Sequence, residues 1–314
     1  MLELTLDRLT KRYHNKIALD QVSTEFTQGV YGLLGANGAG KTTMLRLLCD
    51  ILDPTEGEVL CNGTPIRRLG GEYRRLLGYL PQDFGYYPDF TALRYLRYIA
   101  ALKALPPQTA RDKVEECICL TGLKGEEKQK IRTYSGGMLR RLGVAQALLN
   151  DPRILIMDEP TSGLDPRERI RFRNIISSLS RDRIIILSTH IVSDVEYIAD
   201  EILLLRAGQL IQKGTVTEVA EQVKGRVWEC MVSPAEAEEL GQKYAVANLK
   251  NLAGMVKVRI VSDEKPIPQA EEAEPALEDV YLYYFDQAGP QKRQTYGENP
   301  YERKENADVS DRAL

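Results

Sequence analysis

The sequence predicts an α/β fold built around a mainly parallel sheet, and three observations support this prediction. Residues 35–43 match the phosphate-binding loop pattern G-x-x-x-x-G-K-[ST], between a short apolar run at 30–34 and a helical apolar pattern at 43–48. Apolar runs at 154–157 and within 183–189 are typical of strands that are buried on both faces of a parallel sheet. Segments with helical spacing separate these strands, and such alternation indicates an α/β architecture.

Composition and charge limit the possible functions. The chain has 314 residues, of which 43% are hydrophobic and 28% are charged, as expected for a soluble globular protein of one large or two smaller domains. Its net charge is -3, so no overall basic field points to nucleic acid, and we expect no such partner. The five cysteines are scattered, which predicts reduced thiols in a cytosolic protein. The first residues do not resemble a signal peptide, and no apolar run approaches the roughly 18 residues that span a bilayer.

The N-terminal part reads as short strands joined by turns over residues 1–34, and after the first helix residues 52–59 form a turn that leads into another strand. Tyr13 lies in a polar segment, where an aromatic ring that serves the core would be unexpected. Its ring could stack on a nucleobase, or it could be an ordinary surface tyrosine.

Residues 65–133 predict a mostly helical insertion. A strand ends at Pro81, an aromatic loop follows at 84–90, and amphipathic helices are expected at 92–104 and 111–120. The aromatic loop could fill the core or dock a partner.

The strand and helix alternation returns at 134–205, with helices expected at 139–149 and 166–179. The four arginines of the second helix indicate a solvated face. They are Arg167, Arg169, Arg171 and Arg173. After about residue 220 the pattern changes to a small α+β appendage. Its expected segments are strands at 227–232 and 255–261, a helix at 234–244, a linker at 266–275, a short amphipathic segment at 277–285 and a disordered tail at 286–314.

The phosphate loop predicts a nucleotide site. Its helix would bring unpaired amides and a positive dipole end to an anion, Lys41 would reach the terminal phosphates, and the Thr42 hydroxyl would bind Mg²⁺. The binding residues expected from this loop are Asn37, Gly38, Gly40, Lys41, Thr42 and Thr43.

Polar residues at the ends of three further strands complete the expected chemistry. Asp158 is placed to hold Mg²⁺, and Glu159, which points differently along an extended chain, could activate water for attack on the γ-phosphate. His190 could contact the γ-phosphate or serve as a structural cap. The Gln82 amide could contact water or the metal there.

Taken together, these motifs resemble the ATP-binding subunit of ABC transporters over roughly residues 1–220. The resemblance depends on the order of Tyr13, the loop at 35–43, Gln82, 134–138, 154–159, 162–165 and His190. It implies ATP and Mg²⁺ as cofactors, with Thr42, Gln82 and Asp158 at the metal. It also implies that Tyr13 stacks on adenine, that Gln82 couples the γ-phosphate to the membrane partner, that Glu159 is the catalytic base, that Asp165 belongs to the loop linking two sites, and that His190 is the switch histidine.

The signature turn Ser135, Gly136 and Gly137 opens a helix and so forms a second anion-binding N-terminus. The family usually has Leu-Ser-Gly-Gly-Gln here, whereas this chain has Tyr134 and Met138 at the two ends. Because the helical insertion separates this turn from Lys41, we expect a dimer in which each turn closes on the nucleotide of the other chain. The twin could be identical or a related ATPase subunit.

The expected architecture is therefore a phosphate-loop ATPase of the ABC type. It has a mainly parallel sheet core, an antiparallel β subdomain and a helical subdomain at about 83–150, within an ATP-binding domain at 1–220. An α+β appendage of unassigned role follows at 221–285. We expect the protein at the cytoplasmic face of the cell membrane, bound to a separate membrane-spanning permease and coupling ATP hydrolysis to transport, with export favoured.

Two alternatives are considered. A soluble ABC-type ATPase in translation usually carries two cassettes, and one in DNA repair carries a long coiled coil, whereas this chain has a single cassette without heptads between Lys41 and Ser135. A non-hydrolysing regulatory binder is disfavoured by Glu159. The substrate cannot be read from the sequence, because the permease determines it.

Overall fold

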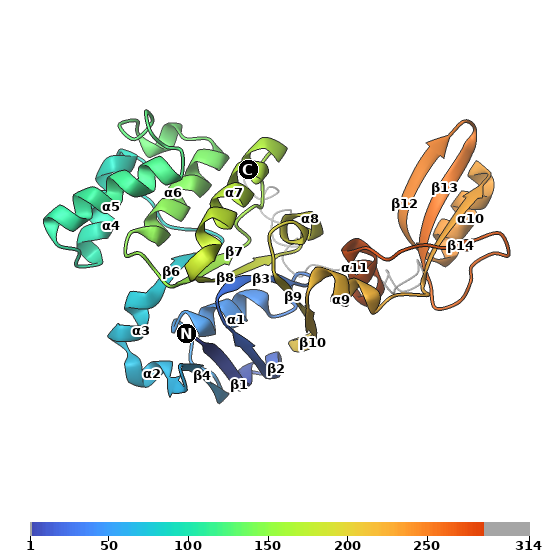
Figure 1. The fold of residues 1–314 in the computed structure, drawn as a ribbon, viewed down its shortest axis with the longest axis horizontal. Helices are drawn as coiled ribbons and strands as arrows, with labels where there is room; N and C mark the ends of the chain where they lie inside the picture. The colour runs from blue at the N-terminus through green and yellow to red at the C-terminus, as the bar shows by residue number, and fades with distance from the viewer. Residues whose placement is uncertain (1, 286–314) are drawn as a thin grey trace, which may run out of the picture. The chain divides into compact units, whose positions relative to one another are not determined.

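The computed structural model describes residues 2–285, which form two compact units with the division after Gln222 (Figure 1). The sequence-based expectation places the end of the ATP-binding domain at residue 220, two residues before this division. The tail expected to be disordered, 286–314, lies outside the described residues.

The first unit is organised around a six-stranded sheet with the order β10-β9-β3-β8-β7-β6. Its strands are β3 (Gly29–Leu34), β6 (Leu77–Leu80), β7 (Ile154–Asp158), β8 (Ile184–Thr189), β9 (Glu201–Arg206) and β10 (Gln209–Gly214). Neighbouring strands from β9 to β6 run parallel, and β10 pairs antiparallel with β9. Every residue of β3, β7 and β8 is buried, as continuous apolar runs predict. The prediction of a mainly parallel core sheet is confirmed.

A second, antiparallel sheet in the same unit has the order β2-β1-β4-β5. Its strands are β1 (Leu4–Tyr13), β2 (Lys16–Phe26), β4 (Glu56–Cys61) and β5 (Thr64–Pro65). β1 and β2 form a hairpin, and its last pair joins Tyr13 to Lys16. Helix α1 (Lys41–Leu48) contacts β2 of this sheet and β7 of the parallel sheet, so the main core lies where the two sheets meet α1.

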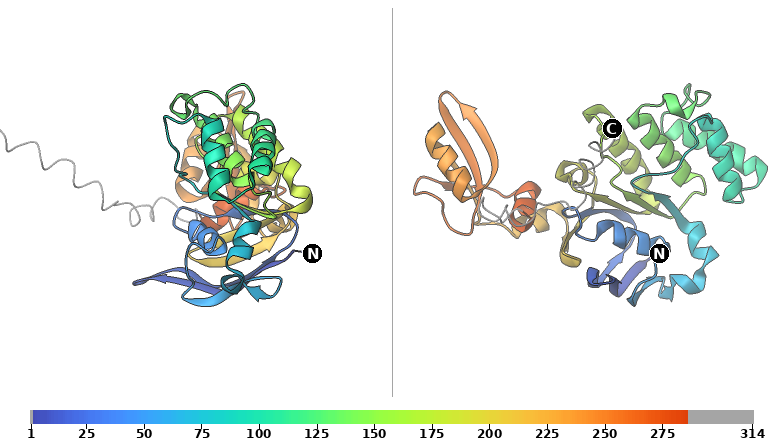
Figure 2. Two further views of the ribbon diagram at one scale, coloured as in Figure 1. Left: turned by 90° about the vertical axis from the view of Figure 1, so that its left-hand side faces the viewer. Right: turned by 180° about the vertical axis from the view of Figure 1, so that it is seen from behind.

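The remaining helices of the first unit include a group of three, α4, α5 and α6, that pack on one another at one end of the parallel sheet (Figures 1 and 2). The bounds are α2 (Ile66–Leu69), α3 (Gly71–Leu76), α4 (Ala92–Leu102), α5 (Pro107–Leu120), α6 (Gly136–Leu148), α7 (Pro166–Leu179), α8 (Val192–Glu196) and α9 (Val216–Glu221), with 3-10 turns at Ile131–Thr133 and Ser180–Asp182. Contact between α6 and β6 joins this helical group to the sheet.

Several helix boundaries differ from the prediction for identifiable reasons. α5 begins at Pro107 rather than at 111, because proline fits the first turn of a helix, where its missing N–H costs nothing. α4 ends at Leu102 rather than at 104, and Ala104 already has a left-handed backbone (φ 55°). α6 begins three residues earlier than predicted, at Gly136. α2 and α3 were not predicted, because helices of four and six residues are too short to show a periodic pattern.

The second unit is a four-stranded antiparallel sheet with the order β12-β13-β11-β14 and two helices. The elements are β11 (Val227–Val232), α10 (Pro234–Lys243), β12 (Ala245–Leu252), β13 (Met255–Val261), β14 (Glu271–Glu272) and α11 (Leu277–Phe285). The predicted strands at 227–232 and 255–261 are confirmed. β12 was missed because its last five residues are exposed and lack apolar alternation, and β14 lies inside the predicted linker. Among residues 2–285, no helix combines the length and apolar character that crossing a membrane requires.

Candidate functional site

The phosphate loop joins β3 to α1, and two of its glycines are required by space. A Cβ atom on Gly40 would lie 2.4 Å from the main-chain oxygen of Ala18, and Gly40 has φ 110°. A Cβ on Gly35 would lie 2.4 Å from the main-chain oxygen of Leu205. Because real side chains do not tolerate such contacts or readily adopt this backbone, the loop keeps its tight path only with glycine at both positions.

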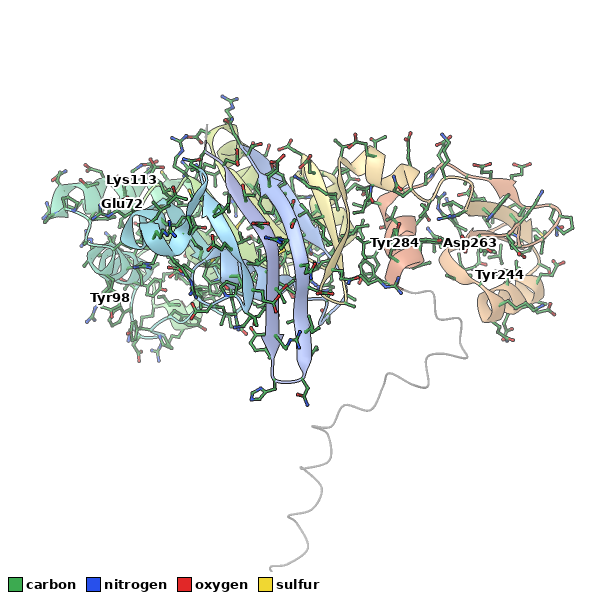
Figure 3. All side chains as sticks on the ribbon, turned by 90° about the horizontal axis from the view of Figure 1, so that it is seen from below. Glu72, Tyr98, Lys113, Tyr244, Asp263 and Tyr284 are labelled. Atoms are coloured by element: carbon green, nitrogen blue, oxygen red, sulfur yellow. The ribbon has the colours of Figure 1, made fainter. Side chains whose placement is uncertain are left out.

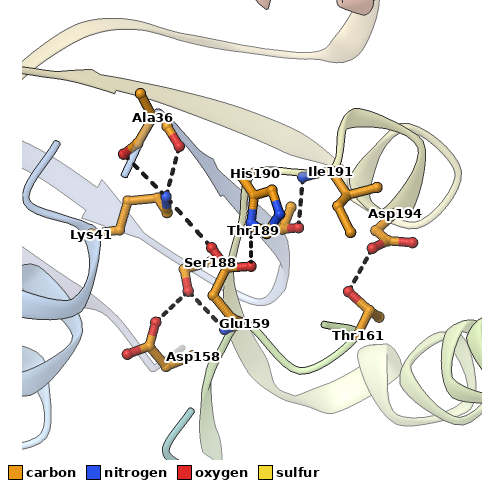
Figure 4. A network of polar contacts seen from close by, with 11 residues as sticks. Ala36, Lys41, Asp158, Glu159, Thr161, Ser188, Thr189, His190, Ile191 and Asp194 are labelled. Carbon is orange, nitrogen blue, oxygen red and sulfur yellow. Dashed lines mark hydrogen bonds and ion pairs between the residues drawn. The ribbon is translucent and has the colours of Figure 1, made fainter. Parts of the chain in front are cut away.

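Lys41, the first residue of α1, is buried at the floor of this loop (Figure 4). Its Nζ donates to the main-chain oxygens of Gly35 (2.6 Å) and Ala36 (3.3 Å) and lies 3.5 Å from Oε1 of Glu159. Burial lowers the pKa of Lys41, and the nearby carboxylates of Glu159 and Asp158 counteract this effect. The loop therefore presents a partly desolvated ammonium group beside the carboxylate of Glu159.

Asp158 is the last residue of β7, Glu159 follows it directly, and the two carboxylates engage different partners. Asp158, fully buried, accepts a hydrogen bond from Ser188 Oγ (2.6 Å). Glu159 Oε2 lies 2.9 Å from His190 Nδ1, and the Glu159 N–H donates to Ser188 Oγ (3.0 Å). Figure 4 shows Ser188 between the two acids. Ser188 was missed from the sequence, although its place near the end of β8, opposite Asp158 in the register, could have indicated it.

Glu159 has a left-handed backbone, with φ 47°. A non-glycine residue adopts this conformation at a cost of about 1 kcal/mol or more, and such residues cluster at functional sites. The bend turns the chain immediately after β7, so Glu159 points to Lys41 and His190 while Asp158 remains within the strand. The strain and the polar contacts mark this bend as the centre of the site.

Most of the predicted nucleotide residues line one cavity of about 560 Å³. It is lined by Tyr13, Lys16, Ala18, Ala36, Asn37, Gly38, Gly40, Lys41, Thr42, Thr43, Gln82, Glu159, Ser162 and His190. Tyr13 is 39% exposed, so its ring stands at the rim. Lys16 and Ala18 were missed, and Ser162 was named only as part of the motif at 162–165, without a role at the site. For Lys16 the signal is its pairing with Tyr13 at the end of the hairpin.

The donor set at this cavity fits Mg²⁺. Thr42 and Gln82 supply hydroxyl and amide oxygens at the cavity, and Asp158 supplies a carboxylate at the adjoining strand end. Residues 2–285 contain no group of three or more His, Cys, Asp or Glu side chains placed to hold a metal alone. This arrangement suits Mg²⁺, which in phosphoryl-transfer sites takes few protein ligands and completes its shell with phosphate oxygens and water.

The signature turn is not among the residues that line this cavity. Ser135 caps α6, its Oγ accepting from the Met138 N–H (3.2 Å), and both Ser135 and Gly136 are exposed. Gly136 instead lines a second cavity of about 480 Å³, which it shares with Gln82 and Ser162. Asp165, also predicted from the resemblance, caps α7 through a bond from the Glu168 N–H (2.9 Å). Ser135 and Gly136 at the start of α6 are therefore exposed and lie outside the cavity that the phosphate loop lines.

The comparisons with known proteins point to one family. The sequence pattern of the ABC transporter family matches residues 19–162. The ABC transporter ATP-binding protein YxlF of Bacillus subtilis, itself uncharacterised, is 36% identical over 226 residues, covering 72% of this chain and 75% of that protein. The Nod factor export ATP-binding protein I of Cupriavidus metallidurans is 34% identical over 239 residues, covering 76% and 78%.

Solved structures show the same relationship. The dimeric structure of the ATP-binding cassette MJ0796, in a post-hydrolysis state bound to ADP and Pi, superposes with a TM-score of 0.62 at 26% identity. The match covers 68% of this chain and 98% of that cassette.

Proposed function

Since this chain belongs to the family of ABC transporter ATP-binding proteins, we propose that it is the ATP-hydrolysing subunit of an exporter, which dimerises around ATP and drives a separate membrane-spanning permease. Members of this family are ATPases. The proposal depends mainly on one observation: a single cavity is lined by the phosphate loop, Gln82, Glu159 and His190. Export is favoured because one of the similar proteins is a Nod factor export ATP-binding protein.

The binding roles follow from the positions of the side chains. The amides of the phosphate loop and Lys41 bind the β- and γ-phosphates, and Tyr13 at the rim stacks on the base. Thr42, Gln82 and Asp158 would hold Mg²⁺, which would supply positive charge to neutralise the phosphates. Phosphate oxygens can take over the Lys41 ammonium from the Gly35 and Ala36 oxygens and from Glu159.

Glu159 is the proposed general base. A carboxylate released from Lys41 can accept a proton from a water that attacks the γ-phosphate. His190 lies 2.9 Å from the other oxygen of Glu159 through Nδ1, so it orients the base while its ring borders the cavity. Ser188 fixes the bend from the other side by accepting from the Glu159 N–H.

Dimerisation is supported by the signature turn. The exposed N-terminus of α6 offers amides and a positive dipole end to an anion, and it does not line the cavity of its own chain. A second copy, or a related ATPase subunit, that faces the phosphate loop across a two-fold axis would complete both sites at once. ATP then joins the two subunits, and hydrolysis releases them.

The permease is proposed to dock on the aromatic loop at 84–90. Tyr87, Phe90 and Tyr98 form a cluster with ring centroids 4.8 to 6.3 Å apart, and Arg94 stacks over Phe90 at 4.0 Å. Tyr87 and Tyr98 are 48% and 39% exposed (Tyr98 is labelled in Figure 3). Such exposed aromatic and arginine side chains are enriched in protein interfaces. This docking would place the chain at the cytoplasmic face of the membrane.

The proposal is tested on the purified full-length chain with ATP and Mg²⁺. We expect ATP hydrolysis, and a shift from monomer to dimer in sedimentation when a non-hydrolysable ATP analogue is saturating. Co-purification in detergent with a multi-spanning protein tests the transporter role. A chain that stays monomeric with the analogue, with the permease present, would contradict the proposed motor.

A further inference from the structure

Two neighbouring arginines on α6 contact different parts of the chain. Arg141 is buried, and its Nη1 donates to the main-chain oxygens of Thr121 (3.3 Å) and Gly122 (2.6 Å). Arg140 instead donates from Nη1 to the main-chain oxygen of Gln82 at 2.5 Å. Arg141 therefore ties α6 to the turn that follows α5, whereas Arg140 ties α6 to the loop that leaves β6.

The surroundings of Arg140 point to the reaction centre. Asp83, Asp158 and Glu159 lie close enough to favour its charge, while burial lowers its pKa. Arg140 also lines the 480 Å³ cavity, and Gln82 lines both this cavity and the nucleotide cavity. Gln82 and Ser162 thus lie where the two cavities meet, and Arg140 holds the main chain of Gln82.

We infer that Arg140 is a positioning residue: by holding the Gln82 carbonyl, it sets where the Gln82 amide stands in the nucleotide cavity and links that position to the signature turn at the start of α6. This inference rests on the proposed function. A charge-assisted hydrogen bond is shorter and stronger than a neutral one, so it can restrain a segment that lacks regular structure between β6 and α4.

The inference predicts that the effect of replacing Arg140 depends on the presence of the Gln82 side chain. In the full-length chain, Arg140→Met should lower kcat about tenfold, the scale for losing one hydrogen bond to a charged group, and raise the Mg²⁺ concentration needed for half-maximal rate. Binding of ADP without Mg²⁺, measured by calorimetry, should stay unchanged. In a Gln82→Ala background the same substitution should change nothing further, because residues that act as a unit are not additive.

Two further variants separate positioning from general damage. Arg140→Lys keeps the charge and one donor and should retain most of the activity. Arg68→Met, on the exposed side of α2, removes an equivalent side chain away from the cavity and should behave like the unaltered chain. Effects of Arg140→Met and Gln82→Ala that multiply would overturn the inference, as would an unchanged kcat in Arg140→Met.

Hydrogen exchange tests the restraint without any nucleotide. Amides at 81–91 should exchange faster in Arg140→Met than in the unaltered chain, with Arg140→Lys between them and Arg68→Met unchanged. Equal exchange in all four proteins would overturn the inference, even if ATP were hydrolysed normally. Conversely, failure of the unaltered chain to hydrolyse ATP would count against the proposed function, while the exchange result would still decide whether Arg140 holds the loop.

Discussion

Two buried carboxylates pair with cations in different units of the molecule, and the geometry of the two pairs differs. In the second unit, Asp279 accepts from Arg259 Nε (3.0 Å) and Nη2 (2.6 Å), and also from the Ala276 N–H (2.7 Å). In the nucleotide cavity, Glu159 Oε1 lies 3.5 Å from Lys41 Nζ. The first pair is a tight two-pronged bond, and the second is a looser contact.

The net pKa shifts of the two cations are opposite in direction. Hydrogen bonding to Asp279 raises the pKa of Arg259, whereas burial lowers the pKa of Lys41. Asp279 stands in the first turn of α11 and Arg259 in β13, so their bond holds the helix to the sheet. Glu159 has a left-handed backbone and borders a 560 Å³ cavity. Burial of a carboxylate is common to both regions. Strain and an open cavity distinguish the site from the structural pair.

The substitution with the largest expected effect removes the charge of Glu159. Glu159→Gln should lower ATP turnover by about 10²-fold or more, the scale for losing a general base, and should trap ATP in a stable dimer. Steady-state hydrolysis and sedimentation measure the two effects. Glu72→Gln on α3, an exposed carboxylate labelled in Figure 3, is the control and should hydrolyse ATP normally. Near-normal turnover in Glu159→Gln would remove Glu159 from the role of base.

The converse test breaks the structural pair. Asp279→Ala leaves the Arg259 guanidinium, which is only partly exposed, with fewer partners, so the free energy of unfolding should fall by about 2 kcal/mol. Trp228 is the only tryptophan of the chain and lies in β11, so its fluorescence reports unfolding of the second unit in a denaturant titration.

The matched control for this pair is Asp263→Ala. Asp263 pairs with Arg226 at 3.1 Å and accepts from the Tyr283 hydroxyl at 3.2 Å, but its side chain is 65% exposed, so we expect the free energy of unfolding to change by no more than about 0.5 kcal/mol. ATP turnover should be unaffected by either substitution. A large loss of turnover in Asp279→Ala, with stability unchanged, would reverse the distinction drawn between the two carboxylates.

The same contrast explains what the sequence could predict. The phosphate loop, β7 and β8 carry local patterns, so the sequence alone predicts these elements and the residues at their ends. Ser188 and the contact between Lys41 and Glu159 depend on which strands are neighbours, and the left-handed backbone of Glu159 is not encoded in its residue type. β12 was missed for a similar reason, because pairing with β13, rather than its own pattern, makes it a strand.

The smallest expected effect is at the rim of the cavity. The sequence allows Tyr13 to be either a base-stacking residue or an ordinary surface tyrosine. Its ring is 39% exposed and Lys11 Nζ lies 5.3 Å from the ring centroid, so stacking on a base would displace only part of its hydration. Tyr13→Ala should weaken ATP binding about fivefold, near the low end of base stacking energies, whereas Tyr13→Phe keeps the ring and should bind normally. Calorimetry with inorganic triphosphate, which has no base, provides the comparison. If Tyr13→Ala weakens triphosphate binding as much as ATP binding, or weakens neither, the ring does not stack on the base.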